Sequence, residues 1–364
     1  MSIKNRLLFI LLACSMLPMI FIGTLGYFNA KKALENAQIE ALNSIAYFKA
    51  KKIEDFFAEQ IKHIKIAQQR PNIKKYASIL AGFSGDFSSP LDKAIRDEMD
   101  RTLRMYQPIN NYTNAMFANP QGRIVYVLNR SSASGNIDNF SPELWEKAFE
   151  EGKTSVYFSD IFKNKTQVDQ LSILVTAPVH NFDGKFLGVI AFEIDMVSIF
   201  EFVQNLTGMG KTGETIIARK DQDTALFLNP LRHDPNAALM RKAFTGESQA
   251  IPFQEAFKDN VGCGFSFDYR GQKVIAAWRN IPLVNWAMVS KIDVSEAFEP
   301  SATQRNFILL LVIAVIILGI LLAHLVAKSI SDPIQILQKG TAEIGSGNLD
   351  HKVGTEAKDE IGQL

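Results

Sequence analysis

Two long apolar stretches constrain this chain more than any other feature of its sequence. Residues 7–28 run for 22 positions without a charged side chain, and residues 307–326 run for 20 positions with His324 as their only polar side chain. A helix of about 20 apolar residues covers the roughly 30 Å hydrocarbon core of a bilayer. We therefore expect two transmembrane helices, at 7–28 and at 307–326.

A cleaved signal peptide is the alternative interpretation of the first stretch. Lys4 and Arg6 would supply its basic start, yet the apolar run continues 14 residues beyond Cys14 and no small-x-small cleavage site closes it. An uncleaved membrane anchor fits these residues better.

The segment between the two stretches, 29–306, has 278 residues. Long segments cross a membrane largely regardless of their charge, and the basic residues Lys4, Arg6 and Lys328 favour cytoplasmic ends. We expect a multi-pass protein of a bacterial inner (cell) membrane, with a cytoplasmic tail at 1–6, residues 29–306 in the periplasm and 327–364 in the cytoplasm. This layout is typical of a receptor, because a transporter needs more spans.

The composition excludes several other classes of protein. The 39 basic and 38 acidic side chains leave a net charge of +1, which argues against nucleic acid as a partner. Cys14 and Cys263 are the only cysteines, and the five histidines show no His-x-x-x-His pairing. We expect no catalytic residue, no metal and no cofactor in this chain.

Residues 208–213 read G-x-G-x-x-G, a pattern shared with dinucleotide-binding sites. Such a site needs the motif between a strand and a helix, so that the helix N-terminus faces the pyrophosphate. Here a predicted helix precedes the motif and a predicted strand follows it. We therefore expect an ordinary loop.

The exterior segment is predicted to begin with a long helix at 29–70. No Pro or Gly interrupts these residues, which would extend roughly 60 Å at 1.5 Å per residue. Six apolar residues recur at helical spacing and predict one buried stripe: Leu42, Ile45, Ile53, Phe56, Ile64 and Ala67.

Beyond Pro71 the pattern changes to short strands and turns. Strand, helix, strand and hairpin follow one another, with a helix that begins after Ser141 and ends at Gly152. A similar order recurs, since both halves end in a strand that runs into Ile-Asp, at 194–195 and at 292–293. We expect an α+β fold with two related modules of antiparallel sheet, at 71–195 and 196–300.

Several short motifs in residues 29–300 resemble the double Cache (dCache) family of extracellular sensor domains. They are Tyr157-Phe158-Ser159-Asp160, Thr176-Ala177-Pro178-Val179, Asp183-Gly184, Gly188-Val189-Ile190, Thr212-Gly213-Glu214-Thr215 and Asp268-Tyr269-Arg270-Gly271. The resemblance implies two PAS-like Cache modules, of which the first is membrane-distal and the second membrane-proximal. It also implies a small-molecule ligand, held in the distal module.

Residues 327–364 resemble a HAMP domain. Ile330, Ile334, Leu337, Thr341 and Ile344 step by four and three residues, which is a heptad seam that packs on a partner helix. The resemblance implies signalling roles for Pro333, Ile334, Leu337, Gly347, Leu349, Val353 and Glu360. We expect an incomplete HAMP domain here, with its second helix and an output domain beyond Leu364.

The candidate ligand-binding residues are carried over from amino-acid-binding members of the dCache family. They are Tyr126, Trp145, Tyr157, Asp160 and Glu193. The arginine that would hold a ligand carboxylate is absent, because Pro142 stands at its position. A free α-amino acid is therefore disfavoured, and a cationic amine or an uncharged ligand stacked on Trp145 stays open.

Each of these residues also has an ordinary structural interpretation. The three aromatic side chains could pack in a core, and Asp160 could cap a loop. The next candidate site lies in the proximal module, around Arg219, His233 and Trp278.

The leading functional interpretation is the input half of a sensor histidine kinase. In it, a homodimer embedded in the membrane binds a small exterior ligand and relays the event through HAMP toward a response regulator. A chemotaxis receptor that acts on a coupling protein and a diguanylate cyclase are alternatives. A membrane-anchored periplasmic binding protein is the rival of another class, although such an anchor would need no cytoplasmic heptads.

Overall fold

The structure is a computed structural model, and it describes residues 3–82, 90–106, 112–129, 140–164, 170–244, 250–326, 329, 332–348, 350 and 352–354. The chain divides into two units. One, the sheet unit, comprises Ile39–Glu296. The other, the helical unit, comprises Met1–Gln38 together with Ala297–Leu364.

Helix α1 (Ile3–Gln69) confirms the expected long N-terminal helix and continues without a break through both predicted segments, 7–28 and 29–70. In the sheet unit its buried stripe contains Leu42, Ala46, Ile53, Phe57, Ile64 and Ala67. The stripe prediction was wrong at two positions, because Ala46 and Phe57 are buried where Ile45 and Phe56 were expected. Phe57 makes edge contacts with Phe158 and Trp286, at 5.0 and 5.2 Å between ring centroids. It therefore ties α1 to both sheets described below.

The first sheet follows α2 (Pro71–Leu80) and α3 (Pro90–Arg104). Its strands are β1 (Tyr112–Ala118), β2 (Ile124–Val127), β3 (Tyr157–Phe158), β4 (Phe162–Lys163), β5 (Leu171–His180) and β6 (Phe186–Asp195). They form an antiparallel sheet in the order β2-β1-β6-β5-β3, with β4 also paired to β5. Helix α5 (Pro142–Gly152) packs on one face through Ala148, which meets Met116, Leu174 and Ala191.

Helix α5 begins where the sequence predicts it. The hydroxyl of Ser141 accepts a hydrogen bond from the backbone N–H of Leu144 at 3.2 Å, and Pro142 occupies the first turn. A Ser N-cap satisfies one of the otherwise unpaired N–H groups, and proline has no N–H to lose there.

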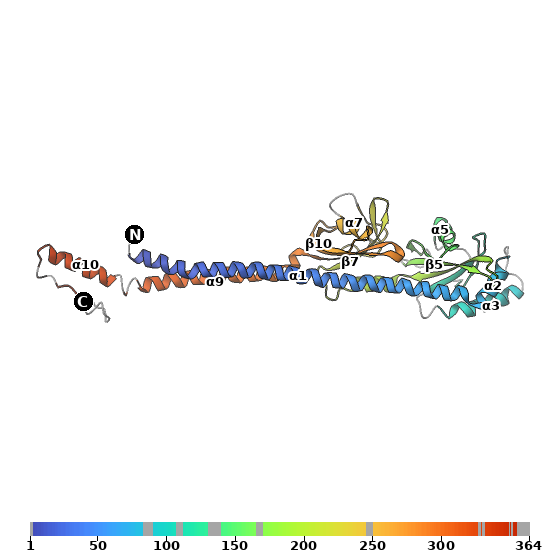
Figure 1. The fold of residues 1–364 in the computed structure, drawn as a ribbon, viewed down its shortest axis with the longest axis horizontal. Coiled ribbons are helices and arrows are strands. Elements are labelled where there is room, and N and C mark those ends of the chain that lie inside the picture. The colour runs from blue at the N-terminus through green and yellow to red at the C-terminus, as the bar shows by residue number, and fades with distance from the viewer. Residues whose placement is uncertain are drawn as a thin grey trace. The chain divides into compact units, whose positions relative to one another are not determined.

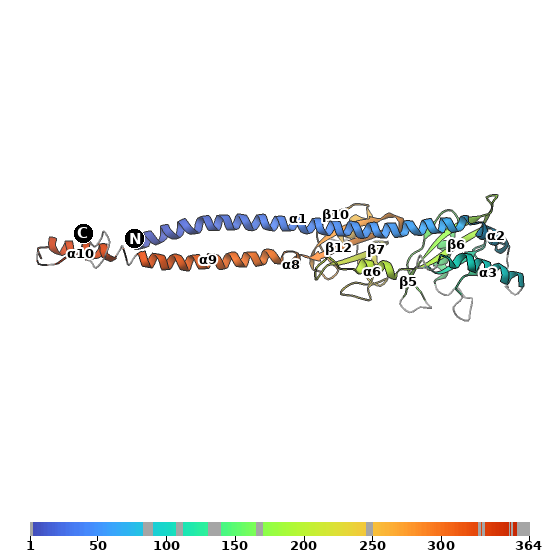
Figure 2. The same ribbon diagram turned by 90° about the horizontal axis from the view of Figure 1, so that it is seen from below.

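The second sheet follows α6 (Val197–Gln204). Its strands are β7 (Glu214–Asp221), β8 (Thr224–Phe227), β9 (Lys242–Phe244), β10 (Gly262–Phe267), β11 (Lys273–Ile281) and β12 (Trp286–Asp293). They form an antiparallel sheet in the order β10-β11-β12-β7-β8-β9. Helix α7 (Ile251–Phe257) covers one face and α1 lies along the other (Figures 1 and 2). The expected α+β class with antiparallel sheets is confirmed.

Helices α8 (Val294–Ala297) and α9 (Glu299–Val326) follow β12 directly in the chain. Among the described residues, one helical segment is long and apolar enough to cross a membrane, Ala302–Leu322, with a mean hydropathy of 2.8. It overlaps the predicted span at 307–326. The predicted span at 7–28 is helical within α1, and its passage through a membrane stays a prediction.

Helix α10 (Asp332–Gly345) contains three of the residues expected to signal, Pro333, Ile334 and Leu337. Gly347 follows the helix with φ +104°, a conformation that favours glycine. Val353 lies against Gly340, so close that a Cβ placed on Gly340 would come within 2.7 Å of it. Leu349 and Glu360 lie outside the described residues.

Candidate ligand-binding sites

Trp145 lies on α5, half-buried over the first sheet. Its indole Nε1 donates a hydrogen bond to the backbone oxygen of Gly122 at 3.0 Å. The ring stacks on Phe140 and contacts Phe149, with centroids 5.8 and 6.2 Å apart. The polar edge of Trp145 is therefore occupied by the protein, and its ring packs against two aromatic neighbours.

Tyr126 does not share the face of the sheet on which Trp145 lies. Its register partner is Phe117, next to Met116, and successive residues of a strand point to opposite faces. Met116 packs on the α5 side, so Tyr126 points to the other side, where its hydroxyl donates to Asp100 of α3 at 2.6 Å. Tyr126 and Trp145 therefore lie on opposite faces of the sheet, and a contact of Tyr126 with a ligand stays a prediction.

Glu193 of β6 is 1% exposed, on the same face as Ala191 and α5. Its Oε1 accepts a hydrogen bond from the side-chain amide of Asn164 at 2.8 Å. Burial raises the pKa of the Glu193 carboxyl, and the hydrogen bond from Asn164 opposes that rise. A buried carboxyl of this kind is either a structural hydrogen-bond acceptor or an anchor for a ligand cation.

Tyr157 begins β3, and Asp160 lies two residues after the end of this strand. Burial raises the pKa of Tyr157, against the lowering effect of Lys147. The Asp160 side chain is 44% exposed and lies 4.0 Å from Lys147 Nζ and 3.8 Å from Arg219 Nη1. Asp160 and Glu193 thus have different partners, and their convergence on one distal pocket stays a prediction.

The second sheet carries a cavity of about 500 Å³ on the face that α7 covers. Its floor is apolar, formed by Ile216, Val274, Ala276 and Val289. Aromatic rings surround it: Phe227, Phe244, Phe253, Phe267 and Tyr269. Its charged lining residues are Arg241, Lys242, Asp268 and Lys291. We call this space the proximal cavity.

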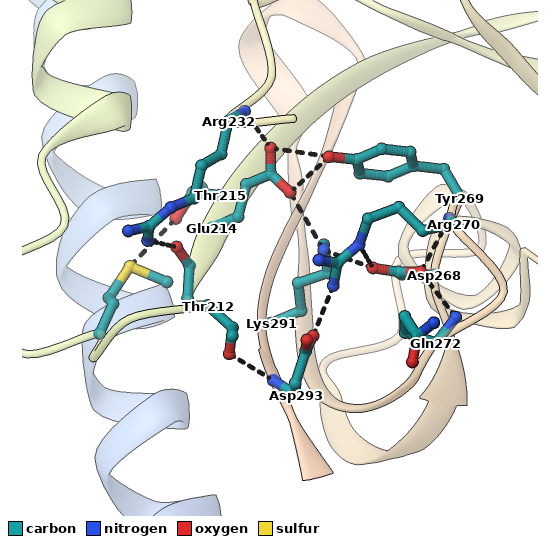
Figure 3. A network of polar contacts seen from close by, with 12 residues as sticks. Thr212, Glu214, Thr215, Arg232, Asp268, Tyr269, Arg270, Gln272, Lys291 and Asp293 are labelled. Atoms are coloured by element: carbon teal, nitrogen blue, oxygen red, sulfur yellow. Dashed lines mark hydrogen bonds and ion pairs between the residues drawn. The ribbon is translucent and has the colours of Figure 1, made fainter. Parts of the chain in front are cut away.

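Lys291 is the central cation of the proximal cavity. It lies on β12, two residues after Val289 and so on the same face of the sheet. Its Nζ lies 3.0 Å from Glu214 and 2.7 Å from Asp268, and the three side chains are at most 4% exposed (Figure 3). A buried cation needs such partners, because an unpaired charge in this position would cost several kcal/mol of desolvation.

Asp268 begins the turn between β10 and β11 and binds two cations. Its Oδ2 accepts from Arg270 Nε at 2.6 Å as well as from Lys291, and Arg270 Nη2 reaches Asp293 at 2.5 Å (Figure 3). Desolvation favours a higher pKa for Asp268, but the hydrogen bonds and charges of Lys291 and Arg270 outweigh it and lower the pKa. Asp268 is therefore a carboxylate at neutral pH.

Tyr269 packs among the cations of the same site. Arg241 lies 4.8 Å and Lys291 4.9 Å from its ring centroid. Its hydroxyl lies 3.1 Å from Glu214 (Figure 3). Burial raises the pKa of Tyr269, and the charge of Glu214 and the hydrogen bond to it add to that rise. The phenol thus stays protonated and donates to Glu214.

The residues named in advance for a proximal site do not line this cavity. Arg219 faces Asp160, His233 is exposed, and Trp278 packs at the margin of the apolar cluster over the sheet. One sequence signal could have found the site, because Lys291 interrupts the apolar run of β12. Among the described residues, no group of three His, Cys, Asp or Glu side chains gathers as a metal site would require.

The glycine-rich motif at 208–213 holds a carboxylate of its own chain. Glu296 of α8 accepts from the backbone N–H groups of Lys211 and Thr212, at 2.6 and 2.7 Å, and from the Thr212 hydroxyl at 2.5 Å. Desolvation acts to raise the pKa of Glu296, but these hydrogen bonds outweigh it and lower the pKa. Gly210 has φ +64°, and a Cβ there would lie 2.4 Å from Glu296 Oε1. The motif is thus a loop, between α6 and β7, as expected.

Comparison with known proteins gives two domain matches. Residues 30–301 match the Cache domain family, and residues 325–364 match the HAMP domain. The chain is 21% identical over 378 residues to the methyl-accepting chemotaxis protein McpA of Bacillus subtilis (strain 168), an alignment that covers 100% of this chain and 50% of McpA. A stretch of 93 residues is 30% identical to the transducer protein CosT of Halobacterium salinarum and covers 26% of this chain and 12% of CosT.

The crystal structure of the periplasmic sensory domain of the Campylobacter jejuni chemoreceptor Tlp1 has a similar fold. It aligns with a TM-score of 0.50 and 14% identity, over 73% of this chain and 99% of that domain. The chain spans half the length of McpA and a smaller part of CosT. Since the Cache match covers well over half of its residues, the chain belongs to the Cache-domain family of sensors and carries its sensor domain together with a HAMP domain.

Proposed function

We propose that this chain is the input half of a transmembrane sensory receptor, which binds a small molecule outside the cell and relays the event through HAMP. The observation that carries the proposal is the continuity of the chain from cavity to span. Lys291 of the proximal cavity lies on β12, which leads through α8 into α9, and α9 contains the apolar segment Ala302–Leu322. In the proposed receptor, a ligand-induced change in β12 would pass along the chain through α8 to the apolar segment of α9.

The proposed topology has two spans in a bacterial inner membrane, with 29–306 in the periplasm. Support for the first span comes from the helical unit. Large apolar side chains of α1 are exposed there, among them Phe9, Leu17, Phe21 and Leu25. Gly23 of α1 faces Ile308 of α9, with an ideal Cβ position 3.5 Å from its side chain. Small residues at such contacts allow membrane helices to approach closely.

We propose a homodimer in which α10 packs on its partner. Ile334 is 39% exposed although it occupies a predicted heptad core position. An exposed heptad seam is covered when two copies pair. A shift of α9 would then change the packing of this seam, and a ligand biases the change by its different affinity for the two states.

For the output, a chemotaxis receptor acting on a coupling protein is the first proposal. The support is McpA, a methyl-accepting chemotaxis protein whose alignment covers the whole of this chain and half of McpA. A sensor histidine kinase with a response regulator remains the second candidate, since Cache and HAMP domains precede both outputs. The coding sequence downstream of Leu364 discriminates the two directly.

In the distal part of the sheet unit, at 71–195, we propose that Trp145, Tyr157, Asp160 and Glu193 contact a ligand. The buried carboxyl of Glu193 and the exposed carboxylate of Asp160 support a ligand with an amine. Losing one charge-assisted hydrogen bond typically weakens binding about 10- to 100-fold. Asp160→Ala should therefore weaken the thermal stabilisation of the full chain by amines or polyamines, while its melting temperature without ligand stays nearly the same. A much lower melting temperature without ligand would make Asp160 a structural cap.

A hybrid receptor tests the relay. Residues 1–364 fused to the signalling half of McpA should change kinase output in response to at least one compound from a panel of amines, polyamines, carboxylates and purines. Ile334→Asp puts a charge into the seam and should lock or abolish the response without altering ligand-induced thermal stabilisation. The matched control is Ile336→Asp, on the same helix but outside the heptad positions and 52% exposed. An unaltered response of the Ile334→Asp receptor would make 327–364 a passive tail.

A further inference from the structure

The proximal cavity has the size of a small-molecule site. Its volume of about 500 Å³ falls within the range of about 300–1,000 Å³ in which proteins bind metabolites. Its lining also has the usual composition of such a site, an apolar and aromatic surface with a few polar groups. What it would bind follows from which of those polar groups still have hydrogen-bonding capacity.

Asp268 has no capacity left for a ligand. Its Oδ1 accepts from the backbone N–H groups of Arg270 and Gln272, at 2.8 and 3.0 Å. Its Oδ2 accepts from Arg270 Nε and Lys291 Nζ, at 2.6 and 2.7 Å. A carboxylate offers about four acceptor positions, and these four bonds fill them. Among the described lining residues Asp268 is the acidic side chain, so a ligand ammonium group finds no open carboxylate there.

The second carboxylate, Glu214, stands behind Lys291 and is also occupied. Its Oε1 accepts from the backbone N–H of Arg232 at 2.5 Å. Its Oε2 binds Lys291 at 3.0 Å, and the Tyr269 hydroxyl lies 3.1 Å from the same oxygen. Glu214 therefore holds Lys291 in place and does not face the cavity.

The cationic side chains at the rim of the cavity, in contrast, have N–H donors that no hydrogen bond among the described residues uses. Arg241 donates to Asp234 at 2.8 Å and to the backbone oxygen of Tyr269 at 3.1 Å, which uses two of its five N–H groups. Lys242 donates to Asp221 at 2.7 Å, which uses one of three. Arg241 and Lys242 are adjacent at the rim, where each is between a third and about half exposed. The described part of the lining thus offers N–H donors rather than acceptors.

The net charge around the cavity is negative, which by itself disfavours an anionic ligand. Lys291 and Arg270 face Glu214, Asp268 and Asp293, which leaves one negative charge, while Arg241 and Lys242 are each paired with an aspartate. Coulomb energy falls with distance, so the side chains that line the cavity count most. In its described lining, three cations (Arg241, Lys242 and Lys291) stand against one carboxylate, Asp268, whose acceptor positions are filled. Tyr269 strengthens this preference, because two cations already lie within 5 Å of its ring and would repel a third.

We propose that the proximal cavity binds a small organic anion, a carboxylate joined to an apolar or aromatic body and lacking an amine. Arg241 is the main donor to the carboxylate, with Lys242 beside it. Phe227, Phe253 and the floor of the sheet contact the apolar body. The site is distinct from the distal residues at 71–195, and it would give the receptor a second input on the strand that leads into α9.

The test uses compounds that share one body and differ in charge. Phenylacetate, phenethylamine and phenylalanine form one set, and 4-methylpentanoate, isopentylamine and leucine form another. Titrated into the full chain in detergent micelles, at least one of the two acids should bind and raise the melting temperature. The matching amine should not, and the amino acid should bind at least about tenfold more weakly than the acid, since its ammonium loses water without gaining an acceptor. Failure of both acids, or equal binding of an amine, would overturn the proposal.

Three variants assign the binding to this cavity. Arg241→Gln should weaken acid binding about 10- to 100-fold, the usual effect of losing a charge-assisted hydrogen bond. Ala243→Trp, at the rim on β9, should fill the cavity and block binding without removing a charge. Arg101→Gln, on α3 with a side chain 77% exposed, is the matched control and should bind like the wild type. Acid binding that is unchanged in both Arg241→Gln and Ala243→Trp would place the acid elsewhere and contradict the proposal.

Anion binding by the proximal cavity does not depend on the proposed sensory function. Only the role of that binding as a second input rests on it. Binding in micelles tests the cavity, whereas the hybrid receptor tests the relay. An acid that binds without changing kinase output would leave the site assigned and count against the relay.

Discussion

Glu296 accepts hydrogen bonds from both the backbone N–H and the hydroxyl of Thr212, at 2.7 and 2.5 Å. The Thr212 hydroxyl in turn accepts from the backbone N–H of Asp293 at 3.1 Å, where β12 ends. Two residues after Thr212 comes Glu214, which binds Lys291 in the proximal cavity. One short segment thus connects the cavity wall with α8, directly before the helix that contains the apolar span.

Glu296→Gln should loosen this connection. The amide cannot accept with both of its terminal atoms, so in either orientation its NH2 group would face a backbone N–H, that of Lys211 or that of Thr212. We expect a loss of about 1 kcal/mol, comparable to the loss of a helix N-cap, and a shifted baseline output in the hybrid receptor. Gly210→Ala should act in the same direction, because its Cβ would displace Glu296. Thermal melts and kinase output measure the two effects, with the exposed Glu299→Gln as the matched control.

The same contact has a defined pH dependence. The pKa of Glu296 is lowered in the folded protein, so its stabilising effect is complete above the ordinary value of 4.5 and is lost as the pH falls through the lowered value. The difference in melting temperature between wild type and Glu296→Gln should therefore be constant from pH 7 to 5 and shrink below 4.5. A difference that persists at pH 3 would show that the charge is not what matters.

The buried side chain of Lys49 should make the stability of the protein depend on pH in the alkaline range. Lys49 is 6% exposed, and its ammonium donates to the backbone oxygens of Val203 and Asn205, at 2.7 and 2.8 Å, where α6 ends. Burial lowers the pKa of Lys49 to about 8 from 10.5. Between these values the unfolded chain holds a proton that the folded chain has released, so this group makes stability rise with pH, by up to roughly 3 kcal/mol.

Melting temperatures of wild type and Lys49→Met measure this effect. The melting temperature of the wild type minus that of the variant should increase as the pH is raised from 8 to 10.5. The same difference should be constant between pH 6 and 7.5. Lys52→Met, at an exposed position of the same helix, should show no such change. A melting-temperature difference that decreases above pH 8 would mean that folding favours the charged form of Lys49.

Glu193→Gln should stabilise the protein at neutral pH in the absence of ligand. The pKa of the buried Glu193 carboxyl is raised, so its ionisation disfavours the folded state as the pH rises above the ordinary 4.5. Glutamine keeps the oxygen that accepts from Asn164 and removes the charge. The melting temperature should rise on the order of a few degrees at pH 7 and stay equal to wild type at pH 4. Glu201→Gln, exposed on α6, serves as control, and a fall at pH 7 would mean that the charge has a buried partner.

The sequence predicted the long helix, the antiparallel sheets and the Ser141 cap because each depends on local periodicity or on a single turn. It was less informative where side chains meet across elements. Strand register turns Tyr126 toward α3, away from the face of the sheet that carries Trp145. Register is set by pairing across residues far apart in the chain. Phe57 replaced Phe56 in the buried stripe because two aromatic residues from separate sheets, Phe158 and Trp286, converge on it.

The proximal cavity shows the same limit for a site. Lys291 in an apolar strand was a visible irregularity, yet its partners Glu214 and Asp268 lie on β7 and in the turn after β10, and only the sheet order brings them together. The motif at 208–213 could be recognised as a loop from its flanking elements. That it holds Glu296 depends on where α8 begins after β12, which no local pattern specifies.

The proposed receptor requires residues 29–306 and residues 327–364 to lie on opposite sides of the membrane. A dual reporter, active as a phosphatase only outside and as a fluorescent protein only inside, can be fused after Lys31, after Glu299 and after Gly340. We expect phosphatase activity without fluorescence at Lys31 and Glu299, and fluorescence without phosphatase activity at Gly340. The same signal at Glu299 and Gly340 would contradict the proposed topology, because no membrane would then separate the Cache domain from HAMP.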